Sequence, residues 1–170
     1  GDDYNSDSYN NNTDGYNSNV DYQTFHDELN PYGQWITYPG YGNCWVPNVA
    51  TGFSPYLTGG QWAYTQYGWT WASDYAWGWA PFHYGRWTYD DYYGWIWVPG
   101  SEWAPAWVSW RYSDNYCGWA PLSPGISIGV SFTNYTCPND WWVFVGPQYL
   151  YRPDYNRYWS GPRYNAAIIN

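Results

Sequence analysis

The feature that most constrains the fold of this chain is a repeated spacing of glycine and tryptophan. A Gly-x-Trp triplet opens each unit, at residues 33–35, 60–62 and 85–87. A Tyr-Gly-x-x-Trp segment follows each triplet, at residues 41–45, 67–71 and 93–97. Residues 117–121 repeat the Gly-Trp-Ala-Pro of residues 78–81 and form part of a fourth unit. Self-similarity at a period of about 25 residues indicates tandem copies of one supersecondary unit.

Inside the units, aromatic residues alternate with small or polar residues, as in Trp107-Val108-Ser109-Trp110. This alternation is typical of β-strands, whose successive side chains face opposite sides of a sheet. Frequent Gly and Pro residues keep the strands short and join them by tight turns. We therefore predict an all-β fold of short antiparallel strands in about three and a half tandem units. Each unit is expected to be a hairpin followed by a third strand.

The composition divides the chain into three parts. Residues 1–24 are rich in Asn, Ser and Asp, which predicts an extended N-terminal tail. Residues 25–145 form the expected Trp-rich β domain, which ends in a C-terminal hairpin of strands at 126–133 and 141–145. Residues 146–170 are rich in Pro, Tyr and Arg and predict an extended C-terminal segment.

Two short segments near the ends carry more specific expectations. Residues 25–30 are compatible with one helical turn, which Pro31 would end. Residues 166–169, with the sequence Ala-Ala-Ile-Ile, suggest an added edge strand. Helix is otherwise expected to be minimal.

The last part of the N-terminal tail has the alternation of a strand. In residues 16–24 one face carries Tyr16, Val20 and Tyr22, and the other carries polar side chains. A strand donated to the sheet edge of another copy gains a ladder of backbone hydrogen bonds. We predict that this tail joins copies of the protein through these three residues; packing against its own domain is the alternative.

Charge narrows the classes of partner. The chain has 14 acidic residues and five basic ones, a net charge of −9, and seven of the acids lie in residues 1–28. An acidic chain without a basic patch argues against nucleic acid and anionic membrane surfaces as partners. No run reaches the roughly 18 apolar residues that a membrane-spanning helix needs. We expect a secreted or cell-surface protein, in a mature form from which a targeting segment was removed.

The three cysteines, Cys44, Cys117 and Cys137, fit an oxidising compartment better than a metal site. None are spaced as Cys-x-x-Cys, and the chain has only two histidines. We predict one disulfide between Cys117 and Cys137, which would tie the last repeat unit to the C-terminal hairpin. Cys44 could instead bridge to either of them.

No catalytic motif emerges, and we expect neither enzyme activity nor a cofactor. The chain has no Gly-x-Ser-x-Gly element, no metal-ligand set and no phosphate-binding loop. His83 and Arg86, with Asp90 or Asp91, form the only cluster that hints at a site. Residues 83 and 86 of a strand would face opposite ways, so His83 is expected to make structural hydrogen bonds.

Several segments together resemble a family of secreted, Trp/Tyr/Gly-rich proteins of Gram-negative bacteria whose function is not established. The matching segments are WGWAPFHYGRW (77–87), YGWIWVPG (93–100), WAPAWVSWR (103–111) and CGWAPL (117–122). The resemblance extends over residues 25–170 and leaves out the tail. It implies export and an all-β domain, and it brings no known active site.

The abundance of aromatic residues directs the functional expectation. Aromatic residues make up 26% of the chain, more than one small core can bury, and exposed aromatic surface generally marks a partner. We expect a structural, self-associating extracellular protein, a filament or matrix subunit joined to copies of itself by its N-terminal tail. The alternative is a carbohydrate-binding module of the cell envelope or matrix, in which Trp and Tyr rings stack on sugars.

Overall fold

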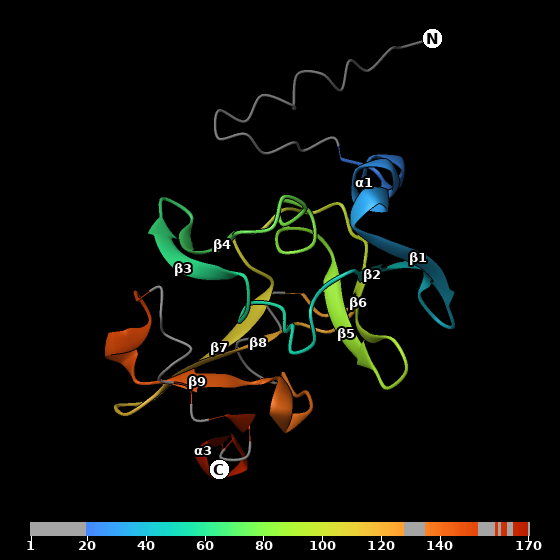
Figure 1. The fold of residues 1–170 in the computed structure, drawn as a ribbon. Coiled ribbons are helices and arrows are strands. Elements are labelled where there is room, and N and C mark those ends of the chain that lie inside the picture. The colour runs from blue at the N-terminus through green and yellow to red at the C-terminus, as the bar shows by residue number, and fades with distance from the viewer. Residues whose placement is uncertain (1–19, 128–134, 153–158, 160, 163–164, 170) are drawn as a thin grey trace.

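The protein is built from four β-hairpins in series, followed by one more short strand (Figure 1). The structure is a computed structural model that describes residues 20–127, 135–152, 159, 161–162 and 165–169. The strands are β1 Gly33–Tyr38, β2 Gly42–Pro47, β3 Gly60–Thr65, β4 Gly68–Ser73, β5 Arg86–Asp90, β6 Gly94–Val98, β7 Val108–Tyr112, β8 Cys117–Pro121 and β9 Val143–Val145. All strand pairs are antiparallel, which confirms the all-β class.

Each hairpin is centred on two tryptophans that lie directly opposite one another. The four cross-strand pairs are Trp35–Trp45, Trp62–Trp71, Trp87–Trp97 and Trp110–Trp119. All eight rings belong to the central hydrophobic cluster or pack against it. The tryptophan spacing repeats because each hairpin packs one face, with two indole rings, against a common core.

The opening glycine of a repeat unit makes room for the second tryptophan of its hairpin. A Cβ atom added at Gly33 would lie 2.6 Å from the ring of Trp45, and one at Gly60 would lie 2.8 Å from the ring of Trp71. Gly85 has the same relationship to Trp97, at 2.7 Å from its ring nitrogen. Contacts this short do not occur for real Cβ atoms, so the indoles can lie against the backbone only at glycine.

The hairpins join into three sheets, and not in chain order. Hairpins β1–β2 and β5–β6 form a four-stranded sheet in the order β1-β2-β6-β5, in which Trp45 pairs with Trp97. β3 and β4 form a sheet of their own, and β7, β8 and β9 form the third. The expected third strand of each unit is wrong for the described residues, because the segments that follow β2, β4 and β6 form turns and loops. Of the expected C-terminal hairpin only β9 is described, since residues 128–134 lie outside the described residues.

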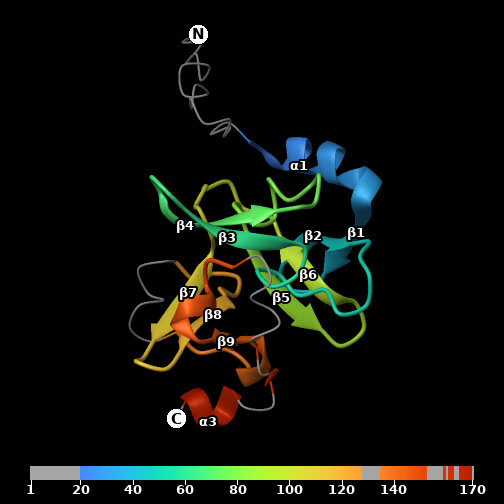
Figure 2. The ribbon, with the colours of Figure 1, turned by 60° about the vertical axis from the view of Figure 1, so that its left-hand side comes forward.

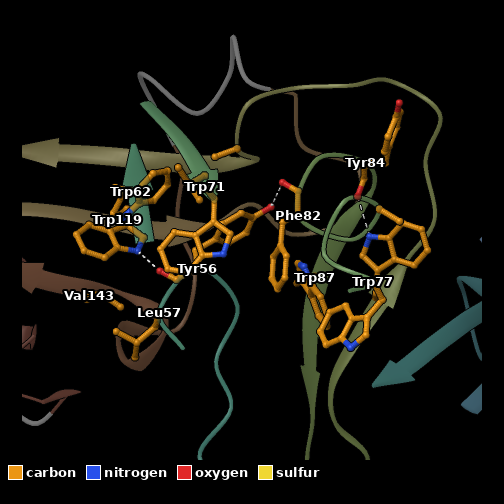
Figure 3. Close-up of a cluster of buried hydrophobic side chains, with 14 of the residues drawn as sticks. Tyr56, Leu57, Trp62, Trp71, Trp77, Phe82, Tyr84, Trp87, Trp119 and Val143 are labelled. Atoms are coloured by element: carbon orange, nitrogen blue, oxygen red, sulfur yellow. Dashed lines mark hydrogen bonds between the residues drawn. The ribbon is translucent and has the colours of Figure 1, made fainter. Parts of the chain in front are cut away.

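Tyr56 connects these separate pieces at the centre of the molecule (Figure 3). Its side chain is fully buried, and its hydroxyl donates to the carbonyl of Phe82 at 3.0 Å. The indole nitrogen of Trp119 donates to the carbonyl of Tyr56 at 2.7 Å. The same phenol oxygen accepts from the backbone N–H of Trp107 at 3.3 Å. One tyrosine thus ties the loop after β2 to the loops after β4 and β6 and to β8.

The N-terminal end of the described chain is helical, which corrects the strand expected at residues 16–24 for residues 22–24; residues 16–19 lie outside the described residues. Helix α1, Tyr22–Leu29, begins at Asp21, whose side chain accepts a hydrogen bond from the Thr24 N–H at 2.9 Å. Phe25 and Leu29 are spaced one helical turn apart and are both buried. The 3₁₀ helix η2, Asn30–Tyr32, follows and contains Pro31.

The C-terminal end also differs from expectation. Residues Asn165–Ile169 form the short helix α3 and not an edge strand. Asn165 anchors it, because its buried amide donates to the carbonyls of Asn139 and Trp142 at 2.8 and 2.6 Å. Two 3₁₀ turns, η3 Asn139–Trp141 and η4 Pro147–Tyr149, lie on either side of β9. Figure 2 shows α1 and α3 at opposite ends of the molecule.

The expected Cys117–Cys137 disulfide is not formed in the structure, where all three cysteines are free thiols. Cys117 belongs to the central cluster together with Trp119. Cys137 packs against a second cluster, around Trp142 and Phe144, which lies across the β7–β8–β9 sheet. The two thiols therefore face different cores, an arrangement that the linear sequence does not disclose.

Candidate interaction surfaces

The exposed aromatic residues of the described chain are nearly all tyrosines, and most of these lie at or near hairpin turns. Among the residues that the structure describes, Trp79, 38% exposed, is the only exposed tryptophan. Every hairpin carries exposed tyrosines at or near its turn: Tyr41; Tyr64 and Tyr67; Tyr89, Tyr92 and Tyr93; Tyr112 and Tyr116. The tryptophans thus serve mainly as core, and the surface question falls on the tyrosines. Tyrosine suits interfaces, because it covers apolar area and keeps a polar tip.

Strands β1 and β3 are open edges of their sheets. β1 ends the four-stranded sheet, and β3 pairs with β4 alone. Within the described residues, no hydrogen bond reaches the backbone of either strand from its outer side. An open strand edge is a template for pairing with another chain.

The two open edges also lack the usual protection against pairing. β1 reads Gly-Gln-Trp-Ile-Thr-Tyr and β3 reads Gly-Gln-Trp-Ala-Tyr-Thr, with no charged residue and no proline in either. Of the other edge strands, β5 and β7 each contain an arginine, Arg86 and Arg111. β9 has only three residues, and β4, though also uncharged, already donates the N–H of Trp71 to the carbonyl of Pro105 at 3.1 Å. Charges and prolines are the devices by which proteins blunt strand edges. The edges at β1 and β3 are therefore both open and unblocked.

A second surface forms where the turns of hairpins β1–β2 and β5–β6 meet. We call it the acidic tyrosine patch, and it consists of Tyr38, Tyr41, Asp90, Tyr92 and Tyr93. The hydroxyl of Tyr38 donates to Asp90 Oδ1 at 2.6 Å, and the ring of Tyr38 meets that of Tyr93 edge-on, with centroids 6.5 Å apart. Tyr41 stacks on Tyr38 at 6.0 Å with an interplanar angle of 9°.

Asp90 is the organising residue of the acidic tyrosine patch. Its Oδ2 accepts the backbone N–H groups of Tyr92 and Tyr93, both at 2.9 Å, which fixes the β5–β6 turn. The hydrogen bond from Tyr38 is the main cause that lowers the pKa of the Asp90 carboxyl below its usual value. The same hydrogen bond is the main cause that raises the pKa of the Tyr38 phenol. The pair is thus held as a carboxylate and a neutral phenol.

A cleft of about 300 Å³ opens beside this patch. One wall is the end of β2 and the loop after it, from Val46 to Phe53; the other wall is formed by Tyr89, Tyr93, Gly94 and Trp95. Two of these aromatic rings are partly exposed, with Tyr89 at 51% and Tyr93 at 37%. The cleft therefore joins two segments that the sequence separates by about one and a half repeat units.

Hairpin β3–β4 repeats the Tyr–Trp ring pair of the cleft at a site outside the cleft. Tyr64 meets Trp69 edge-on at 5.3 Å and 75°, and Tyr89 meets Trp95 at 5.5 Å and 74°. Tyr64 is 70% exposed and uncharged residues surround it in β3. Trp69 also contacts Tyr151 from the C-terminal segment, at 4.8 Å. The two hairpins thus present similar rings in different surroundings.

The cluster of His83, Arg86 and Asp90 does not assemble. His83 is 7% exposed, its Nδ1 lies 2.9 Å from the carbonyl of Ala104, and burial lowers its pKa. Arg86 Nε donates to the carbonyl of Ile126 at 2.8 Å, and its guanidinium lies over the ring of Trp107. Asp90 serves the tyrosine patch instead. The structural hydrogen bond expected for His83 is present.

The residues predicted for self-association lie in different settings. Val20 is 4% exposed and packs in the chain's own core, so it cannot face a neighbour. Tyr22, in α1, is 40% exposed and contacts the ring of Trp35 at 5.4 Å. Tyr16 lies outside the described residues. The open edges of β1 and β3 were missed, although their uncharged, proline-free sequences are a readable signal.

The described part of the chain carries neither a metal-binding cluster nor a membrane-spanning helix. These residues hold no group of three or more His, Cys, Asp and Glu side chains that could bind a metal ion. No helix among them has the length and apolar character needed to cross a membrane.

Comparison with known proteins places the chain in a family without giving it a function. No curated protein and no solved structure matches it detectably. A family model matches residues 26–126, which span all four hairpins. That span contains the motifs on which the resemblance rested, and it leaves out the tail. The chain belongs to the family of unknown function DUF6600.

Proposed function

We propose that this protein is a structural, self-associating extracellular protein whose subunits join through the open edges of β1 and β3. The observation that carries the proposal is the presence of two open, uncharged, proline-free edge strands on one subunit. The role is one of assembly and not of catalysis. Edge pairing replaces the N-terminal strand as the proposed joining element, because Val20 lies in the subunit's own core and Tyr22 lies in helix α1.

Edge pairing supplies a physical driving force for assembly. The outer backbone groups of β1 and β3 have no partner in the described residues, so a strand from another subunit would gain a row of hydrogen bonds. Exposed Tyr64 would add side-chain contacts across the junction. Two different edges on one subunit favour head-to-tail joining, which continues as a filament unless it closes into a ring.

The extracellular part of the proposal, which rests on the family resemblance, is compatible with the state of the thiols. Cys44 and Cys117 are buried, and burial raises the pKa of all three thiols, that of Cys117 and Cys137 to about 11. A thiol that stays protonated reacts slowly, so these cysteines would survive in an oxidising medium without pairing. Cell fractionation, with the protein recovered outside the cytoplasm, tests this part.

Two variants that each block one edge test the joining mechanism. Gln34→Lys with Thr37→Lys charges β1, and Gln61→Lys with Tyr64→Lys charges β3; all four side chains are exposed. Each variant alone should sediment as a monomer, because every junction needs one β1 and one β3. An equal mixture should form dimers, in which the open β3 of one variant pairs with the open β1 of the other.

The control carries the same added charge away from the strand edges, as Gln23→Lys with Asn115→Lys, and should assemble like the unaltered protein. Deleting residues 1–19 should also leave assembly intact, since this removes the tail and keeps α1. Dimers of either edge variant alone would point to β1–β1 or β3–β3 pairing. Full assembly by both edge variants, or its loss on tail deletion, would refute joining through the open edges.

A further inference from the structure

We propose that the cleft between the loop after β2 and hairpin β5–β6 is a binding site for a neutral sugar ring of an uncharged glycan. This inference concerns a different surface from the open edges of β1 and β3, and it does not depend on self-association. It rests on the rings, the charge and the rigidity of the cleft.

The cleft offers aromatic surfaces at a scale that fits one or two sugar units. Tyr89, Tyr93 and Trp95 line one wall, and Phe53 lies on the other. Its volume of about 300 Å³ stands at the lower end of small-ligand sites. Aromatic faces carry negative charge density that attracts the polarised C–H groups of a pyranose ring. The hydroxyls at the edge of a stacked pyranose remain free to form hydrogen bonds with neighbouring polar groups.

The charge around the cleft selects among ligands. None of the residues that line it is charged, so it offers nothing to neutralise a phosphate, sulfate or uronate. Asp90 and Asp91 follow Tyr89 directly in the chain and add negative charge near the cleft, while the Asp90 carboxylate itself is bound by Tyr38 and the N–H groups of the turn. Carboxylates repel anions. They also disfavour a second copy of this protein as the occupant, since it would bring the same acidic turn.

The walls of the cleft are held in place before a ligand arrives. Trp95 lies between Tyr89 at 5.5 Å and Trp141 at 5.0 Å. The ring of Phe53 packs against that of buried Trp87, with centroids 5.6 Å apart. The Asp90 hydrogen bonds fix the turn that carries Tyr93. Rings that are already ordered lose little conformational entropy on binding, which favours recognition of a weakly interacting sugar.

One hydroxyl of the cleft is available to a ligand. Thr51 is exposed on the loop wall and makes no hydrogen bond to the described part of the chain. Gly52 beside it has a φ of 95°, which lets the loop turn back toward Phe53. A hydroxyl opposite two aromatic rings is the arrangement that orients a sugar as well as stacking it.

The experiment measures binding of cellohexaose and maltohexaose, both neutral, and of an oligogalacturonate of similar length, which is anionic. Saturation-transfer NMR suits this comparison, because it works for monomers and for large assemblies. We expect at least one neutral glycan to bind and the anionic one not to bind. Tyr89→Ala and Tyr93→Ala should each weaken binding about tenfold, the effect of losing one stacked ring.

Tyr64→Ala is the matched control, because Tyr64 forms the same edge-on ring pair with Trp69 but does not line the cleft. It should leave glycan binding unchanged. Absence of neutral glycan binding, preference for the anionic glycan, or an equal loss in Tyr64→Ala would overturn the proposal. So would loss of self-assembly in Tyr89→Ala and Tyr93→Ala without a change in glycan binding, since the cleft would then be a contact between copies.

This test is separate from the test of edge pairing. The variants charged on β1 and β3 should lose assembly and keep glycan binding. The two cleft variants should lose glycan binding and keep assembly. The two proposals can therefore be confirmed or refuted independently of one another.

Discussion

The indole nitrogen of Trp119 donates a hydrogen bond of 2.7 Å to the backbone carbonyl of Tyr56, a residue 63 positions earlier in the chain. This bond joins β8, in the fourth hairpin, to the loop that follows the first. Tyr56 also has a φ of 61°, an unusual conformation for a residue other than glycine. A backbone held in this way indicates that the surrounding packing determines the loop's position.

Removing the Tyr56 hydroxyl should destabilise the whole domain. In Tyr56→Phe the carbonyl of Phe82 and the N–H of Trp107 would both lose a buried partner. We expect the free energy of unfolding to fall by about 1–3 kcal/mol, measured by urea denaturation. Tyr64→Phe removes an exposed hydroxyl and should change it little. Equal effects of the two substitutions would show that Tyr56 does not connect the hairpins.

Filling the space that an opening glycine provides should also be costly. Gly60→Ala would place a methyl group 2.8 Å from the ring of Trp71 and 2.6 Å from the carbonyl oxygen of Ala72. We expect a loss of roughly 1–3 kcal/mol in the free energy of unfolding. Gln61→Ala, next to it and exposed, is the control. A stable Gly60→Ala would mean that the indole does not need to lie against the backbone.

The hydrogen bond between Tyr38 and Asp90 predicts a dependence on pH at both ends of the scale. The pKa of Asp90 is lowered, so its contribution to stability is present above its usual pKa of 3.8 and is lost as the pH falls through the lowered pKa. The pKa of Tyr38 is raised, so its contribution is present below its usual pKa of 10.0 and is lost as the pH rises through the raised pKa.

Tyr38→Phe isolates this hydrogen bond. In this variant the pKa of Asp90, followed by carboxyl ¹³C NMR, should move up toward its usual value. It should stop short of it, because the N–H groups of Tyr92 and Tyr93 still bind the carboxylate. An unchanged Asp90 pKa would mean that the two hairpin turns do not meet through this bond.

Thiol titration distinguishes the structure from the disulfide expected from the sequence. Protein unfolded without reductant should show three reactive thiols, since Cys44, Cys117 and Cys137 are all free. The folded protein should react slowly, because burial raises the pKa of each thiol. A count of one thiol would restore the Cys117–Cys137 bond and contradict the positions of these side chains.

The first three hairpins could be predicted from the sequence because an opening glycine, two tryptophans and a Tyr-Gly turn recur in each at a similar spacing. The fourth hairpin shares only the facing tryptophans, Trp110 and Trp119. The order of the sheet could not be predicted, because the pairing of Trp45 with Trp97 joins the first hairpin to the third. Such a contact depends on how separate hairpins pack, and no period in the sequence records it.

At the N-terminal helix, a real alternation of side chains predicted a strand where the structure has a helix. Alternation in residues 16–24 favoured a strand, yet Phe25 and Leu29 are spaced for one buried helix face and Asp21 is a good N-cap. The burial of Leu29 and its carbonyl's acceptance of the Trp45 indole N–H fix the helix against the first hairpin. Packing against the first hairpin therefore favours the helix over the strand that the local sequence also allows.

The interaction surfaces were predictable only in kind. The abundance of aromatic residues predicted exposed aromatic area. That most tryptophans are buried and most exposed rings are tyrosines follows from the packing of the hairpins. Tyr38 and Asp90 are 52 residues apart and meet only because two hairpins share a sheet. The open edge at β3 likewise follows from which strands pair and which do not.

The central claim is that β1 of one subunit pairs with β3 of the next. Electron cryomicroscopy of the purified full-length protein, with no glycan added, tests it most directly. We predict filaments or closed rings in which a β1 edge lies about 4.8 Å from a neighbouring β3 edge, the spacing of hydrogen-bonded strands. Single unassembled particles, or assemblies in which both edges face solvent, would contradict it.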